Sequence, residues 1–228
     1  MHRDERGLSI GAMVRYADLA KLADPSPFQA IADAAGHVGD RQVRNRGTIG
    51  GSLSWNYPAA CMPIVALACS AEVECVSAGG NSRTLSMNDF HLGAMTTALC
   101  EDEMLTRVIF PRPQPRAGSA YRKWGLVKDA LPVVGVAAMI GIKDGGIASA
   151  GIAVGGLADG AVRCEAAEAE LIGKPVDADT LRAIADVAAD SIPTQSDHWT
   201  PASYRKTLIR RLTFEVVGLA CNRAEIGE

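Results

Sequence analysis

The chain has 228 residues, of which 48% are hydrophobic and 21% charged, and its formal net charge is −3. This length suffices for one large or two small domains with a sizeable core. The acidic balance and an aromatic content of 5% argue against a nucleic-acid partner, which requires clustered basic residues or stacked aromatic rings. The longest apolar stretch, residues 131–142, is too short for a membrane span, and the charged start at Met1 lacks the apolar segment of a secretory signal. We therefore expect a cytoplasmic protein.

The cysteines and histidines form no pattern typical of a metal centre. Six cysteines form no Cys-x-x-Cys pair, and no histidine stands at ligand spacing from any of them. We expect free, mostly buried thiols in a reducing compartment and no metal site within the chain. The four histidines adjoin no recognisable nucleophile motif, so we expect no catalytic acid, base or nucleophile. The cysteines are Cys61, Cys69, Cys75, Cys100, Cys164 and Cys221.

The first half of the chain alternates short strands and helices. Residues 40–52 are expected to form a loop, because they combine three arginines with several glycines and lack apolar periodicity. The other predicted elements are a strand at 8–12, a helix at 18–23 stopped by 24–27, a helix from 28 to 39, a buried helix at 62–69, a hairpin of strands 72–76 and 83–87, and a strand at 103–110.

A run of alternate prolines, Pro111-Arg112-Pro113-Gln114-Pro115, marks the best domain boundary because it favours a stiff, extended connector. We therefore divide the chain into residues 1–113 and 114–228. Beyond the boundary, strands precede helices, which predicts an α+β domain with helices on one sheet face. The strands are expected at 120–126, 133–142 and 147–154, and the helices at 163–172, 179–192 and 201–221, the last with Thr200 as N-cap and Pro201 at its first position.

The segment Thr48-Ile49-Gly50-Gly51-Ser52 is the most informative motif. Two adjacent glycines allow close backbone approach, and successive N–H groups in such a turn can form a concavity for a phosphate. Taken alone, a Gly-Gly pair more often marks a tight turn. The segment lacks the Gly-Lys-Ser/Thr of a Walker A loop and the G-x-G-x-x-G of a Rossmann fold.

Residues 44–53, followed by Pro58-Ala59-Ala60 and Met62-Pro63, resemble the second flavin motif of the molybdenum hydroxylase flavoproteins. These are the medium subunits of carbon monoxide dehydrogenase and the middle domains of xanthine dehydrogenase. Residues 93–111, 119–138 and 203–212 resemble later parts of the same family, in the same order. The resemblance implies an α+β fold: the C-terminal part of an FAD-binding PCMH-type domain, then a carbon monoxide dehydrogenase flavoprotein C-terminal-type domain.

The resemblance also implies which residues bind FAD. Thr48, Ile49, Gly50, Gly51 and Ser52 would bind the pyrophosphate and ribityl region. Leu105 would pack near the isoalloxazine ring and Lys123 near its polar edge, although core packing explains Leu105 equally well and Lys123 could be a solvated strand residue. The arginines at positions 41, 44 and 46 could attract an anion but are more typical of a solvated or ion-paired segment.

This sequence departs from the family in two respects. The family fold begins with an earlier subdomain that carries an Ala-Gly-Gly-x-Ser-Leu motif, whereas residues 1–15 already match the stretch after it. The sequence is thus expected to be a fragment, to have a misplaced start, or to be completed by a partner. In addition, Cys61 stands where the family usually has an acidic residue that contacts the ribityl hydroxyls, and a thiol is a poor hydrogen-bond acceptor. Trp55 and Tyr57 likewise replace a common histidine and aspartate.

The function implied is that of an FAD-dependent oxidoreductase subunit. It would accept electrons from the [2Fe-2S] clusters of a small partner subunit, supplied by a molybdopterin-binding large subunit, and pass them to NAD, a quinone or oxygen. One alternative is a degenerate structural subunit that keeps its docking surfaces but binds no FAD, which Cys61 and the missing first motif favour. Another is a stand-alone flavoenzyme of the same wider fold, such as a cell-wall precursor reductase.

Overall fold

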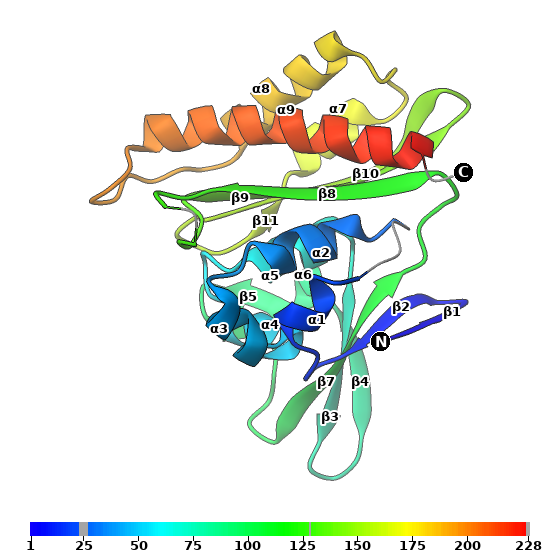
Figure 1. Ribbon diagram of the computed structural model, residues 1–228, viewed down its shortest axis with the longest axis vertical. Coiled ribbons are helices and arrows are strands. Elements are labelled where there is room, and N and C mark those ends of the chain that lie inside the picture. The colour runs from blue at the N-terminus through cyan, green and yellow to red at the C-terminus, as the bar shows by residue number, and fades with distance from the viewer. Residues whose placement is uncertain (23–26, 128, 227–228) are drawn as a thin grey trace.

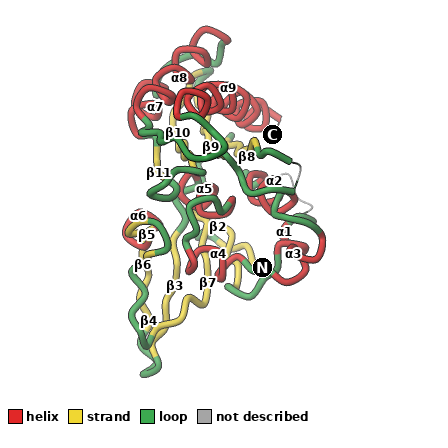
Figure 2. The backbone as a smooth tube through the Cα atoms, turned by 90° about the vertical axis from the view of Figure 1, so that its left-hand side faces the viewer, coloured by secondary structure: helices red, strands yellow, loops and turns green. Residues whose placement is uncertain are grey.

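The computed structural model of the protein describes residues 1–22, 27–127 and 129–226. Two β-sheets follow one another along the long axis, with helices between them and beyond the second sheet (Figure 1). Figure 2 shows α7, α8 and α9 gathered at one end of the molecule and β3, β4 and β7 at the other.

The first half is built around a five-stranded antiparallel sheet with the order β1-β2-β7-β3-β4. A two-stranded sheet of β5 and β6 stands beside it. The strands are β1 (His2–Asp4), β2 (Gly7–Gly11), β3 (Glu72–Ser77), β4 (Ser82–Ser86), β5 (His91–Gly93), β6 (Thr96–Thr97) and β7 (Glu103–Pro111). The helices are α1 (Tyr16–Leu19), α2 (Gln29–Gly36), α3 (Arg41–Arg46), α4 (Ile49–Trp55), α5 (Cys61–Ala68) and α6 (Met87–Phe90).

The second half is a four-stranded antiparallel sheet, β11-β10-β9-β8, followed by three helices. Asp144 and Gly145 both have positive φ and form the tight turn of the β9–β10 hairpin. The elements are β8 (Ala117–Trp124), β9 (Val134–Lys143), β10 (Gly146–Gly155), β11 (Val162–Arg163), α7 (Glu165–Leu171), α8 (Ala178–Ser191) and α9 (Ala202–Ile226).

Most predicted elements are confirmed, with three corrections. The expected loop at 40–52 was wrong, because the structure has the helices α3 and α4 there. The first helix is placed at α1 rather than at 18–23, and residues 23–26 lie outside the described residues. Thr200 is not the cap of the last helix: α9 begins at Ala202, whose backbone N–H donates to the Ser196 hydroxyl at 2.9 Å.

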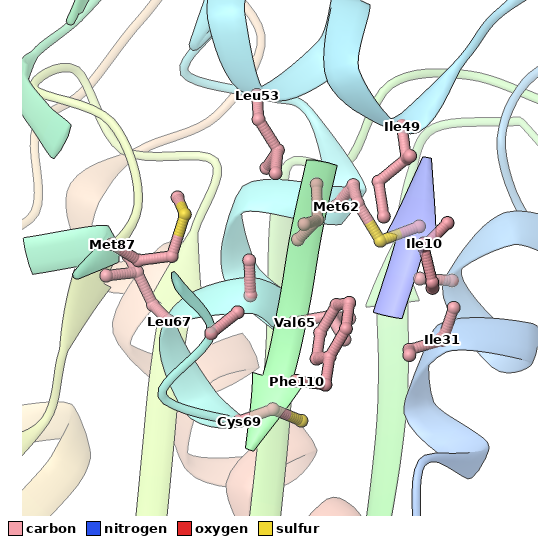
Figure 3. Close-up of a cluster of buried hydrophobic side chains, with 14 of the residues drawn as sticks. Ile10, Ile31, Ile49, Leu53, Met62, Val65, Leu67, Cys69, Met87 and Phe110 are labelled. Atoms are coloured by element: carbon pink, nitrogen blue, oxygen red, sulfur yellow. The ribbon is translucent and has the colours of Figure 1, made fainter. Parts of the chain in front are cut away.

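Helix α5 is the centre of the core, since all eight of its side chains are buried. On one side it packs against the first sheet, where Met62 and Val65 meet Ile10 and Phe110 (Figure 3). On the other side it lies against β9 and β10, so Ala137 and Ala153 of the second sheet belong to the same buried cluster. One apolar core therefore extends through both halves of the chain.

The second sheet is covered on both faces. Helix α9 packs on one face, where Ala120 and Ala138 belong to a second core cluster, and α2 and α5 pack on the other. A strand buried on both faces is expected to be apolar at successive positions rather than alternating. This explains the continuous run in β9, in which eight of the ten residues are buried.

Glycines set the distance between α5 and the second sheet. A Cβ on Gly151 would stand 2.1 Å from the backbone oxygen of Ala68, and one on Gly155 would stand 2.5 Å from the Ile64 side chain. On the opposite face, a Cβ on Gly118 would stand 2.4 Å from the Ala220 oxygen in α9. The close packing of both helix layers thus requires glycine at these strand positions.

Polar contacts also join the two halves. Arg223 near the end of α9 forms an ion pair with Asp33 of α2 at 2.6 Å, and its guanidinium also donates to the Ser119 carbonyl at 2.7 Å. Arg163 forms an ion pair with Glu168 and donates to the Ser70 hydroxyl at 2.8 Å. Both arginines are largely buried, and the bonds from Arg223 to Asp33 and from Arg163 to Ser70 fix the orientation of the halves.

The end of α4 is fixed to the segment around β5 and β6. Asn56 adopts the left-handed conformation that ends the helix, and its side-chain amide donates to the carbonyls of Gly93 and Thr96 at 2.7 and 3.2 Å. His91 Nε2 lies 3.3 Å from the Leu53 carbonyl. Burial lowers the pKa of His91 to about 4, although the bond to Leu53 opposes this shift. His91 is therefore neutral in the folded protein near pH 7.

We expect Gly151→Ala to destabilise the protein by at least the 1–3 kcal/mol that is roughly typical of overpacked cores, because Cβ would overlap the Ala68 oxygen. Denaturant unfolding followed by circular dichroism measures this. Gly36→Ala in α2 is the matched control, since a Cβ there meets nothing within 4 Å and should be neutral or stabilising. Equal stability of the two variants would show that α5 can move away from the sheet at little cost.

We expect acid to destabilise the fold through His91. Below pH 6.5 the unfolded state protonates this histidine, whereas the folded state keeps it neutral down to about pH 4. The contribution of the neutral His91 side chain to the free energy of unfolding is therefore complete above pH 6.5 and is lost as the pH falls to about 4. The free energy of unfolding changes by up to about 3 kcal/mol over this range. The free energy of unfolding at pH 7.5 and 4.5 should differ less in His91→Gln than in wild type. The exposed His37→Gln serves as control, and an unchanged difference in His91→Gln would contradict the assignment.

Candidate functional site

The motif Thr48–Ser52 forms the beginning of helix α4 rather than a loop. Thr48 is the N-cap, in extended conformation, and its hydroxyl accepts a hydrogen bond from the Gly51 N–H at 3.1 Å. Neither Gly50 nor Gly51 is among the residues with positive φ. The motif is a capped helix start, and its glycines are not required by backbone conformation.

All four N–H groups of the first turn of α4 have partners within the protein. Ile49 donates to the Val14 carbonyl at 3.1 Å and Gly50 to the Ala12 carbonyl at 2.9 Å. Gly51 and Ser52 donate to the hydroxyl and the carbonyl of Thr48. Helix starts that bind phosphate usually do so through free N–H groups. The expected concavity of inward-pointing N–H groups is therefore wrong for this structure, and polar contacts to a ligand would come from the hydroxyls of Thr48 and Ser52.

The two glycines of the motif have different roles. Gly50 is buried against the end of β2, and a Cβ there would stand 2.5 Å from the Cβ of Ala12. Gly51 is exposed, and the only neighbour within 4 Å of an added Cβ would be the Thr48 hydroxyl at 3.0 Å. Gly50 thus allows α4 to pack on the sheet, while Gly51 leaves an open surface beside two hydroxyls. A ligand could approach the backbone closely at Gly51.

Residues from three separate elements meet behind this surface. Tyr16 of α1 is buried, which raises its pKa, and a hydrogen bond to Ser52 opposes the rise. Burial likewise raises the pKa of the Cys61 thiol, against the influence of Tyr121 and of the Lys123 ammonium. The thiol is therefore protonated at neutral pH and is a weak nucleophile.

The Tyr121 hydroxyl is fully buried without a nitrogen or oxygen partner among the described residues. It faces the Cys61 thiol, and burial raises its pKa well above the usual range. A buried hydroxyl without a full hydrogen bond costs about 1–3 kcal/mol. A carboxylate at position 61 would accept this bond, which fits the expectation that Cys61 replaces an acidic residue.

The structure places Lys123 beside this cluster and Leu105 in the first core. Lys123 is half-buried on β8, and its Nζ donates to the Ala130 carbonyl at 2.5 Å. Leu105 is buried in the first core on β7, where it pairs with Cys75 of β3. Strand β7 contacts α4, and the residue after Leu105, Thr106, accepts a hydrogen bond from the Ala12 N–H, while the Ala12 carbonyl accepts from Gly50.

The three arginines before the motif belong to α3. Arg44 donates to the carbonyls of Val38 and Gly39 at 3.0 and 2.5 Å, which satisfies acceptors near the end of α2. Arg41 and Arg46 are exposed. Arg44 therefore has a structural role, because it binds the carbonyls that follow α2.

Sequence reasoning assigned no role to Tyr16 or Tyr121. Tyr121 lies within a segment that carries the family resemblance, but only the fold shows that its hydroxyl faces Cys61. Tyr16 had no sequence signal, because its relevance depends on contact with residues 36 and 45 positions further along the chain. All six cysteines are free, and Cys100 is the exposed one. Among the described residues, no cluster of histidine, cysteine, aspartate and glutamate could hold a metal ion, and no described helix is long and apolar enough to cross a bilayer.

Two family models match the chain. Residues 1–113 match the FAD binding domain in molybdopterin dehydrogenase, and residues 119–220 match the carbon monoxide dehydrogenase flavoprotein C-terminal domain. The glyceraldehyde dehydrogenase medium chain of Sulfolobus acidocaldarius is 33% identical over 92% of this chain and 74% of its own length. The caffeine dehydrogenase subunit beta of a Pseudomonas species is 31% identical over 95% of this chain and 74% of its own length.

Solved structures agree with the sequence matches. A chain of carbon monoxide dehydrogenase from Hydrogenophaga pseudoflava superimposes with a TM-score of 0.88 at 28% identity, covering 98% of this chain and 77% of that one. A chain of quinoline 2-oxidoreductase from Pseudomonas putida 86 gives 0.86 at 29% identity, covering 98% and 78%. The α+β fold and the expected family are thereby confirmed, and FAD is the cofactor that the matched family model names. The chain belongs to the FAD-binding medium subunits of the molybdenum hydroxylases, the oxidoreductases of the xanthine dehydrogenase and carbon monoxide dehydrogenase type.

Proposed function

We propose that this chain binds FAD at the start of α4 and transfers electrons within a complex of three kinds of subunit. Electrons would come from [2Fe-2S] clusters of a small partner, which receives them from a molybdopterin-binding large subunit. The observation that carries the proposal is the family match, which covers nearly the whole chain. The open surface at Gly51 lies within the matched residues. When bound, FAD supplies the chemistry of accepting and releasing these electrons.

The residues of the chain would bind and orient the flavin. The hydroxyls of Thr48 and Ser52 would donate to phosphate or ribityl oxygens, and Gly51 would allow close approach of the backbone. Ile49 and Gly50 are buried, so their role would be to hold α4 against the sheet. Lys123 would supply positive charge near the polar edge of the ring. Cys61 would occupy the ribityl side, and Leu105 would support the surface from the core.

We further propose that residues 1–113 and 114–228 are the two domains of the subunit. The connector between β7 and β8 and the separate sheets support this division. Their shared core and the ion pair between Arg223 and Asp33 support the proposal that they act as one rigid support for the flavin. The free thiols are consistent with a reducing, cytoplasmic location.

A structural subunit without flavin is the second candidate. Two observations favour it: Cys61 gives the Tyr121 hydroxyl only a weak acceptor, and the first-turn N–H groups of α4 are already bonded within the protein. Flavin released from the purified complex by denaturation and measured by its fluorescence distinguishes the candidates, because the [2Fe-2S] clusters of a partner also absorb visible light but do not fluoresce like a flavin. Flavin in less than stoichiometric amount would support the structural role.

We expect Gly51→Val to abolish flavin retention while the fold is kept, because Gly51 is exposed and the new side chain would fill the surface beside Thr48. Flavin content is read from the fluorescence of flavin released by denaturation, and folding from circular dichroism, on the full-length gene product or the assembled complex. Gly50→Ala is the informative contrast: its Cβ would overlap Ala12, so it should lose stability together with flavin. Lys123→Ala should mainly alter flavin redox behaviour. Normal flavin content in Gly51→Val would show that the start of α4 does not contact the cofactor.

A further inference from the structure

A pocket of about 560 Å³ opens where the two halves of the chain meet. Its walls come from the segment after α4, the loops before β9 and after β10, and the segment that leads into α9. The Gly156 N–H donates to the Pro58 carbonyl at 3.1 Å and joins the halves at its wall. The volume lies within the range of small-molecule sites, roughly 300–1,000 Å³.

The charges at this pocket cancel within the protein. Arg205 is buried, and its guanidinium donates to the carbonyls of Val133 and Gly156 at 2.6 and 2.7 Å and forms an ion pair with Asp197. The Asp197 carboxylate also accepts from the N–H groups of Trp199 and Thr200 at 2.8 and 2.7 Å, and these bonds lower its pKa. The Asp197 carboxylate thus occupies the N–H groups before α9 that could otherwise bind an anion. A ligand with phosphate groups would meet this negative charge and a cation that is already paired.

The remaining walls are apolar and aromatic. Trp199 is 79% exposed, and Leu126 and Leu131 are also exposed at the pocket. Tyr57 stacks on Trp55 with ring centroids 4.7 Å apart, so its ring is held in place. Large apolar side chains exposed around a concavity usually mark a binding site. Gln195 and Ser196 add polar groups to the same wall, so the lining suits a neutral, planar ring with hydrogen-bond acceptors.

We propose that this pocket binds a quinone, which serves as the electron acceptor of the subunit; the acceptor role rests on the proposed function. The pocket wall includes Ala130, whose carbonyl holds the Lys123 ammonium at 2.5 Å. The pocket is therefore adjacent to the residue proposed to lie at the flavin edge. The quinone would take two electrons and two protons from the dihydroflavin and leave as the quinol, and the flavin would return to its oxidised form. Neutral charge, ring shape and two carbonyl acceptors favour a quinone over a nicotinamide dinucleotide.

The test is direct binding of 2,3-dimethyl-1,4-naphthoquinone to the full-length protein by equilibrium dialysis, with NADH measured in parallel. We expect Ala158→Glu, which places a charged chain at an exposed position of the wall, to weaken quinone binding by about tenfold or more. Trp199→Ala should also weaken it through lost stacking. Ala169→Glu is the matched control, since Ala169 is exposed on α7 and is not part of the lining.

Quinone binding that both pocket variants leave unchanged would overturn the proposal, as would NADH binding that Ala158→Glu abolishes. Absence of quinone binding in a well-folded wild-type protein would also overturn it. Flavin content is measured on the same samples by absorbance. Because dialysis detects the quinone itself, a sample without flavin that binds quinone refutes only the proposed function, whereas a flavin-loaded sample without quinone binding refutes only the pocket assignment.

Discussion

The contact of helix α5 with the second sheet is the constraint on which the rest of the structure depends. Gly151 lets the backbone of the helix approach closely, Gly155 makes room for the Ile64 side chain, and α5 is buried on every side. The same helix begins with Cys61, so its depth in the core also sets how close Cys61 comes to Tyr121 on β8. A shift of α5 would therefore change both the packing of the core and the geometry of the candidate site.

The candidate site illustrates how a binding surface can be assembled on rigid elements. The N-cap of α4 holds Thr48 and Ser52 in place, Gly50 lets the helix pack closely on the sheet, and Asn56 fixes the other end of the helix. Each of these contacts removes freedom from α4 before any ligand arrives, which lowers the ordering cost of binding. The same preorganisation means that the N–H groups of the first turn are already committed to protein acceptors.

The sequence predicted the strands and long helices well because their signals are local or periodic. The expected strand at 133–142 and the expected helix at 201–221 correspond to β9 and α9, whose apolar side chains are largely buried. Helices α3 and α4 were missed because each is short, and α4 contains two glycines, which are poor helix formers. Tertiary contact with Ala12 and the Thr48 cap override that propensity. The meeting of Tyr16, Cys61 and Tyr121 could not be predicted, since it depends on three segments far apart in the chain.

The ion pair between Arg223 and Asp33 has a consequence for the order of events during synthesis. The two residues are 190 positions apart, so the ribosome releases α2 long before α9 exists. Strand β8 is made earlier, but until α9 is made α2 lacks the guanidinium that pairs with Asp33, and closing so long a loop is slow. The first half would therefore hold its own sheet before this ion pair forms, so the contact between α2 and the end of α9 belongs to a late stage of folding.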